Sequence, residues 1–180
     1  MNPTVSPERN MLQPVGNICP LPIVEFGNGG METMLTAASY DRQIPVHRRM
    51  TYEQMLQAVE PCSVHVTEGV LPGDVSGVYD ESVSTIVIDG SMTDVQKRCA
   101  LVHELLHWLH ADDSCAGVGK THEEVRVCRE TAMMLVAPDA YIRAEREYDG
   151  EIYQMACELD VTVFVLKCYR RILEGRARAC

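Results

Sequence analysis

Two histidines and a glutamate occur together as His103-Glu104-Leu105-Leu106-His107, an H-E-x-x-H pattern. In an α-helix, side chains four residues apart lie one above the other on the same face. Two imidazoles at that spacing can therefore bind one zinc ion, with Zn–N bonds of about 2.0–2.1 Å. The glutamate beside the first histidine can reach water at the ion and take its proton. The pattern predicts a zinc (Zn²⁺) hydrolase, with His103 and His107 as metal ligands and Glu104 as the general base.

A catalytic zinc site needs a third protein ligand and an open position. His110 is on the same side of the helix as His103 and His107. However, His103 and His110 are about 10 Å apart along a continuous helix, which rises 1.5 Å per residue. One ion cannot bind both unless the helix breaks after His107. We therefore expect His110 to be a helix-end residue or a neighbour of the ligands, and not a ligand itself.

The third ligand is expected to be a glutamate of the next helix. Glu124 is followed by Val127 and Thr131 at helical spacing, which places its side chain on the inward face. Glu123, in the same first turn, should point more to the side. Glu130 precedes Thr131, the residue seven positions after Glu124, and so lies beside the inward face. Glu124 is the favoured ligand, while Glu123 and Glu130 stay open as alternatives.

Other polar residues near this pattern are candidates for supporting roles. Tyr79, His122 and Arg126 are possible donors to the oxyanion that develops when a carbonyl is attacked. Cys99 lies one turn before His103, and Cys128 lies one turn after Glu124. A thiol there could bind the metal or respond to oxidation, but small core residues are the simpler interpretation of both cysteines.

A small set of strands should precede the metal helix. Alternation and turn residues predict strands over 62–67, 75–79 and 84–88, the last two forming a hairpin around Asp80-Glu81-Ser82. If the strand Ser84 to Ile88 is the edge of the sheet, an extended peptide can pair with its free backbone groups. Such an edge would select extended or unfolded substrate segments.

Helices are expected on both sides of these strands. Thr51 can cap a helix that runs to Glu60, and Thr93 can open the metal helix, which runs to His110. Thr121 can cap a helix to Val136, with Glu124 as its capping-box partner. Further helices are predicted over 139–158, with a break at Gly150, and over 162–173. The expected fold class is α+β, with a small antiparallel or mixed sheet packed on the H-E-x-x-H helix and a helical C-terminal part.

Composition divides the chain into an arm and one domain. Residues 1–48 hold five prolines between Pro3 and Pro22 and a glycine-rich stretch, which predicts a weakly ordered arm with a short helix at 31–39. The core is expected over 49–138, and its helical C-terminal part over 139–180. A net charge of −10 argues against binding to nucleic acid or to an anionic membrane.

The sequence also bears on the cellular compartment of the protein. It shows neither a secretory signal nor an apolar stretch that is long enough to span a bilayer, so a cytoplasmic protein is expected. Its eight cysteines contain no C-x-x-C pair and are expected to be free thiols.

The chain also resembles a known family over about residues 50–172. The similar segments are Leu71-Pro72-Gly73, Gly77-Val78-Tyr79-Asp80, Thr85-Ile86-Val87-Ile88-Asp89, Gln96-Lys97-Arg98, His103-Glu104-Leu105-Leu106-His107, Glu124 with Arg129-Glu130-Thr131-Ala132, and Glu158-Leu159-Asp160-Val161-Thr162. These segments resemble the ImmA/IrrE metallopeptidases. The resemblance implies a zincin-like fold of the gluzincin type, with two histidines and one glutamate as zinc ligands.

The family also suggests a substrate, because its members often cut a helix-turn-helix transcriptional repressor and so control phage, mobile-element or stress genes. The expected activity is that of a zinc endopeptidase whose protein substrate is such a repressor. Two alternatives stay open. One is a catalytically silent regulator that binds a partner through the same groove, with zinc structural or absent. The other is an unrelated gluzincin that acts on a broad range of peptides.

Overall fold

The computed structural model describes residues 44–111 and 121–178. The predicted short helix at 31–39 and the predicted loop at 112–120 lie outside the described residues. The elements are α1 (Tyr52–Val59), β1 (His65–Gly69), β2 (Gly77–Asp80), β3 (Thr85–Asp89), α2 (Asp94–His110), α3 (Thr121–Leu135), α4 (Pro138–Glu147), α5 (Ile152–Glu158) and α6 (Val163–Arg178). Six helices and a three-stranded mixed sheet confirm the α+β class.

Capping boxes fix the starts of the first two helices. The hydroxyl of Thr51 accepts from the backbone N–H of Gln54, and the Gln54 side chain accepts from the backbone N–H of Thr51. Thr93 and Gln96 repeat this reciprocal arrangement at the start of α2. Each box satisfies backbone donors that the first turn of a helix leaves unpaired. The predicted starts of both helices are therefore confirmed.

The strand order in the sheet is β1-β3-β2, with β3 in the centre. β2 and β3 form the predicted antiparallel hairpin, with Val78 opposite Val87. β1 pairs in parallel with the other side of β3, with Val66 opposite Ile86. The Ser84 to Ile88 segment therefore lies in the central strand, so the condition under which it could pair with an extended peptide is not met. Within the part of the chain that the structure describes, β1 and β2 are the edges.

The first strand is also displaced from its predicted position. It runs over His65–Gly69 and not over 62–67, and all five of its residues pair with Thr85 to Asp89 of β3. The alternation of side chains begins earlier in the sequence than the pairing does. Because pairing with a distant strand decides where a strand starts, local alternation alone placed it too early.

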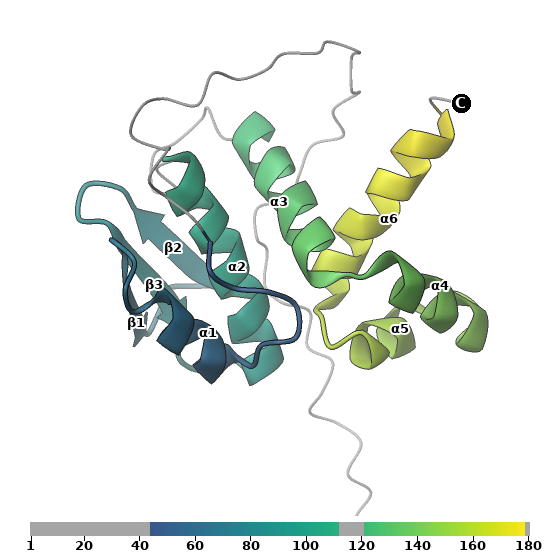
Figure 1. Cartoon of the computed structure of the whole chain (residues 1–180), viewed down its shortest axis with the longest axis horizontal. Coiled ribbons are helices and arrows are strands. Elements are labelled where there is room, and N and C mark those ends of the chain that lie inside the picture. Colours follow the sequence, from purple (N-terminus) through teal and green to yellow (C-terminus); the bar gives the residue numbers. More distant parts are fainter. Residues whose placement is uncertain (1–43, 112–120, 179–180) are drawn as a thin grey trace, which may run out of the picture.

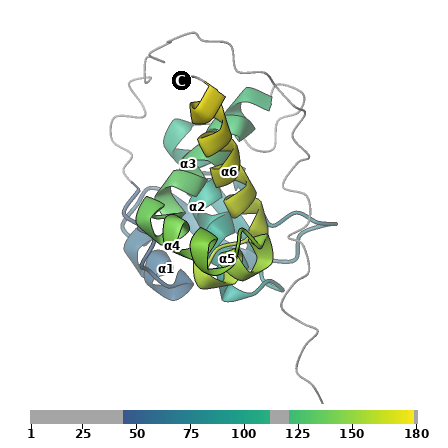
Figure 2. The same ribbon diagram turned by 90° about the vertical axis from the view of Figure 1, so that its right-hand side faces the viewer.

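Helix α2 lies between the sheet and the C-terminal helices (Figure 1). One side of α2 contacts β2 and β3, the other side contacts α3, and α6 packs against α3. Figure 2 shows α4, α5 and α6 forming the face of the molecule opposite the sheet. Since α2 is covered from two sides, its residues from Arg98 to Trp108 are removed from water, while its two ends are more open.

The helices after α2 follow the predicted breaks, with small shifts. Thr121 is the first residue of α3 and not its cap, a difference within the usual uncertainty of helix ends. Pro138 opens α4, where its missing N–H costs no helical hydrogen bond. The predicted break at Gly150 is confirmed, because Asp149 and Gly150 both have positive φ, at 48° and 76°. α6 extends past the predicted end at residue 173.

A single hydrophobic core joins the strands to all six helices. It includes Met55 of α1, Ile86 of β3, Leu105 of α2 and Leu166 of α6, each fully buried. Val46 is also buried in this core, so packing extends into the segment that composition assigned to the arm. In the described part of the chain, none of the helices is both long enough and apolar enough to cross a bilayer.

Candidate metal centre

Helix α2 buries polar side chains that a core helix does not normally contain. Every residue from Arg98 to Trp108 is buried. Among them, His103 is 3% exposed, Glu104 is 5% exposed and His107 is 2% exposed. Polar groups in a core cost free energy unless they are paired or bind a metal. Three buried polar residues within one helical turn and a half are typical of a functional site, because such sites keep side chains that a purely structural core would exclude.

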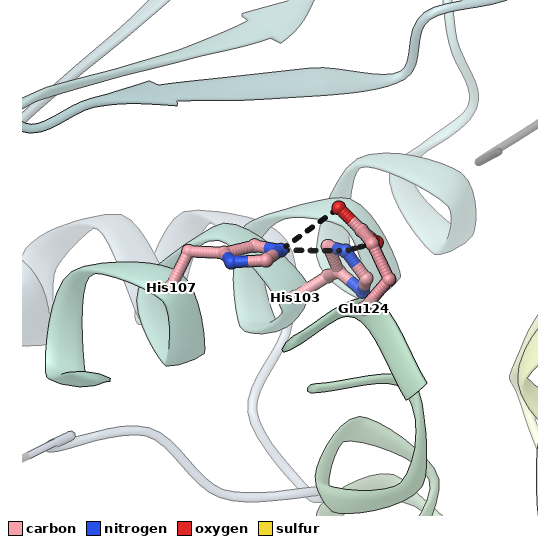
Figure 3. Close-up of side chains that lie close together, drawn as sticks. All are labelled: His103, His107 and Glu124. Carbon is pink, nitrogen blue, oxygen red and sulfur yellow. Dashed lines mark hydrogen bonds and ion pairs between the residues drawn. The ribbon is translucent and has the colours of Figure 1, made fainter. Parts of the chain in front are cut away.

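Glu124 of α3 completes a group of three possible metal ligands with His103 and His107. One donor atom from each residue lies within 4.8 Å of the others. Nε2 of His103 is 3.2 Å from Nε2 of His107 and 3.4 Å from Oε2 of Glu124. Nε2 of His107 is 3.5 Å from Oε1 of Glu124. Figure 3 shows the two imidazoles on one face of α2 and the carboxylate reaching them from the neighbouring helix.

These separations fit a zinc ion. Ligands at about 2.0–2.1 Å from a tetrahedral ion lie about 3.3 Å from one another. The two imidazole nitrogens are 3.2 Å apart, and each lies 3.4 or 3.5 Å from a different oxygen of the Glu124 carboxylate. Two neutral imidazoles and one carboxylate are also a donor set that suits zinc. The residues present therefore fit the ion that the H-E-x-x-H pattern predicts.

Glu104, the residue after His103, packs against the sheet. Its side chain is buried and lies against Gly77, the first residue of β2. The residue follows a metal-ligand candidate in sequence, yet its carboxylate belongs to the interface of α2 and β2. His103 and His107 thus lie next to α3, whereas Glu104 lies next to β2.

The structure separates Glu124 from the alternative ligands. Glu123 is half-buried and is not part of the group of three. Oε2 of Glu130 lies 2.7 Å from Nε2 of His110, the last residue of α2. Sequence reasoning missed this pair, because it depends on how α3 packs against α2, which local patterns do not reveal. Neither His110 nor Glu130 is in the group of three, in keeping with the distance argument against His110.

The candidate oxyanion donors occupy three different environments. Tyr79 is fully buried in β2, and its hydroxyl donates to the carboxylate of Glu81. His122, in the first turn of α3, is exposed, whereas Arg126 is half-buried. Tyr79 is thus already engaged within the hairpin, which argues against a role as an oxyanion donor.

The two cysteines near the pattern are buried free thiols. Cys99 packs where α2 meets the start of α6, and burial raises the pKa of its thiol to about 11 although a hydrogen bond with Thr162 opposes the shift. The thiol of Cys128 hydrogen-bonds with that of Cys168 in α6, and this bond, together with burial, raises the pKa of Cys128. Neither Cys99 nor Cys128 belongs to the ligand group found among the described residues.

All five cysteines in the described ranges are free, namely Cys62, Cys99, Cys128, Cys157 and Cys168. For these five residues, the expectation of free thiols is confirmed. Cys99, Cys128 and Cys168 are buried, as small apolar core residues would be.

Comparisons with known proteins do not add a family to these observations. No protein-family model matches the chain, and no curated protein matches it at a significant level.

Proposed function

We propose that this protein is a zinc-dependent endopeptidase with a zincin-like fold of the gluzincin type. His103, His107 and Glu124 would hold the ion, and Glu104 would act as the general base. The observation that carries the proposal is the convergence of two imidazoles and a carboxylate, at 3.2 to 3.5 Å, on an H-E-x-x-H helix. Two histidines and one glutamate leave a fourth position open, as a catalytic site requires.

Zinc, when bound, would acidify a water molecule and polarise the carbonyl of the scissile peptide bond. The remaining chemistry falls to the protein. Glu104 would accept the proton of the attacking water and later deliver it to the leaving amine. Its burial beside β2 limits the positions that its carboxylate can take, so the proton acceptor is held in place before substrate arrives.

The sheet suggests how a substrate would bind. β2 is an edge strand among the described residues, and it packs directly on α2. An extended peptide can add to such an edge through backbone hydrogen bonds, and here it would pass close to Glu104. This role belongs to β2 and not to the Ser84 to Ile88 strand, which is central. The geometry favours extended or unfolded segments as substrates.

The resemblance to ImmA/IrrE metallopeptidases supports a more specific substrate. We infer that the physiological substrate is a helix-turn-helix transcriptional repressor and that the enzyme acts in the cytoplasm. The net charge of −10 supports a protein substrate over nucleic acid. The cut would fall in a segment of the repressor that can become extended.

Cleavage by the parent protein and a Glu104→Gln variant tests the proposal. Two probes are suitable: fluorescein-labelled unfolded casein, and a repressor encoded beside the gene. The variant keeps the shape of the side chain but cannot accept the proton, so we expect unchanged zinc content and a loss of rate of at least about 100-fold. Glu123→Gln is the matched control and should cleave like the parent. If Glu104→Gln cuts at the parent rate, Glu104 is not the general base.

A further inference from the structure

Gly77 lies unusually close to the side chain of Glu104. A methyl group added at Gly77 would be 2.9 Å from Cγ of Glu104 and 3.2 Å from its Oε1. The same methyl group would be 3.2 Å from Cδ1 of Ile88, the residue opposite Gly77 in β3. Carbon atoms in van der Waals contact are about 3.5–4.0 Å apart. Any larger residue at position 77 would therefore compete with Glu104 for the same space.

The backbone does not explain the glycine at this position. Among the described glycines, only Gly73 and Gly150 have a positive φ, so Gly77 has a conformation that other residues adopt readily. A glycine inside a strand weakens the strand, and it often marks a place where another group approaches closely. Here that group is a buried carboxylate side chain from α2.

We propose that Gly77 is a positioning residue for Glu104: the missing side chain at the start of β2 leaves the space in which the general base is held. This inference rests on the proposed function, since it assigns Glu104 the role of proton acceptor. Gly77 itself touches neither substrate nor metal in this account. It acts by allowing the carboxylate to lie between α2 and the edge strand.

The arrangement predicts a separation of metal binding from catalysis. Cγ of Glu104 is only two bonds from the backbone of α2, so it cannot move away without a change of rotamer. An alanine at position 77 would thus displace the carboxylate. The three ligand candidates lie between α2 and α3, away from Gly77, and would keep their separations. Gly77→Ala should bind zinc and cleave poorly, which is a different outcome from the loss of a ligand.

Kinetics of the full-length zinc-loaded protein give the first test. We expect Gly77→Ala to lower kcat by about 10- to 100-fold, because a misplacement of about 1 Å is enough to cost that much, while KM and zinc content stay near the parent values. Gly69→Ala is the matched control, because its added methyl group would meet Cγ1 of Val87 at 3.2 Å in the same sheet. That control should cleave like the parent. If Gly77→Ala also cleaves at the parent rate, Gly77 does not position Glu104.

A second test does not depend on activity. Overpacking at Gly77 should lower the midpoint of thermal unfolding by about 2–10 °C in the parent. In a Glu104→Ala background, Cγ is absent, and the same Gly77→Ala change should lower the midpoint much less, because only the approach to Cδ1 of Ile88 remains. Equal effects in both backgrounds would overturn the proposed contact.

The two tests separate the possible failures. A parent protein that binds zinc and cleaves, together with a fully active Gly77→Ala variant, would refute the positioning role and leave the proposed function intact. A parent protein that cleaves neither probe would refute the proposed function. The coupling of unfolding midpoints would then still decide whether Gly77 makes the space for Glu104.

Discussion

Arg98 connects the metal helix to two distant parts of the chain. Its side chain is 7% exposed and its guanidinium donates to three backbone carbonyls, those of Arg48, Met50 and Asp160. The first two bonds are both 3.3 Å long. Nη1 also lies 2.9 Å from the carboxylate of Asp160, which is 60% exposed. Arg98 thereby holds the segment before α1 and the turn before α6 against α2, five residues before His103.

The cost of Arg98→Ala can be estimated from these contacts. Hydrogen bonds to a charged group contribute about 1.5–3 kcal/mol each, and bonds at 3.3 Å belong to the weak end of that range. The partly exposed ion pair adds at most about 1 kcal/mol. Since such contributions do not add fully, we expect a loss of about 3–5 kcal/mol, most of it from the three hydrogen bonds to backbone carbonyls. That is a large share of a typical free energy of unfolding of about 5–15 kcal/mol.

Urea unfolding of two further variants tests whether the bonds to backbone carbonyls account for the loss of stability in Arg98→Ala. Arg143→Ala removes an exposed i,i+4 ion pair of 3.0 Å, with side chains 69% and 74% exposed, and should cost at most about 0.5 kcal/mol. Asp160→Asn removes the carboxylate but keeps the backbone carbonyl. It also suits the positive φ of 52° at this position, so it should cost at most about 1 kcal/mol. If Arg98→Ala costs no more than Arg143→Ala, or if Asp160→Asn costs as much as Arg98→Ala, the carbonyl contacts do not carry the stability.

Two other predictions concern the surroundings of the site. His110→Gln should leave the zinc content of the purified protein unchanged, because His110 pairs with Glu130 at 2.7 Å outside the ligand group; a variant that loses zinc would make His110 a ligand. Iodoacetamide at pH 8 should modify the exposed Cys157 but leave Cys99 intact, as followed by mass spectrometry. Burial raises the pKa of Cys99 from 9.0 to about 11, which alone lowers the thiolate fraction about 100-fold. Equal rates for the two thiols would contradict the burial of Cys99.

Local patterns in the sequence predicted the helices well. Thr93 and Gln96 mark the start of α2 by chemistry that depends on residues three apart, and the helix ends at His110 as expected. The preference for Glu124 over Glu123 also came from helical periodicity, and it is Glu124 that lies beside the imidazoles. Such features depend on neighbours in sequence, so they can be predicted without the fold.

The features that sequence reasoning missed depend on distant contacts. The order of the strands follows from β1 pairing in parallel with β3, which no local alternation reveals. The contact of Gly77 with Glu104 and the pair of His110 with Glu130 each join residues at least 20 positions apart. A glycine within a predicted strand was the one available signal, since it often marks a close approach.

Zinc content measured by mass spectrometry on the full-length protein, purified without chelator, tests the central claim most directly. We expect about one zinc ion per chain in the parent and in Glu123→Ala, and a strong loss in Glu124→Ala and His107→Ala. These glutamates are adjacent in α3, yet only Glu124 has carboxylate oxygens within 3.5 Å of both imidazoles. A parent protein without zinc, or a Glu124→Ala variant that retains as much zinc as the parent, would contradict the proposed metal centre.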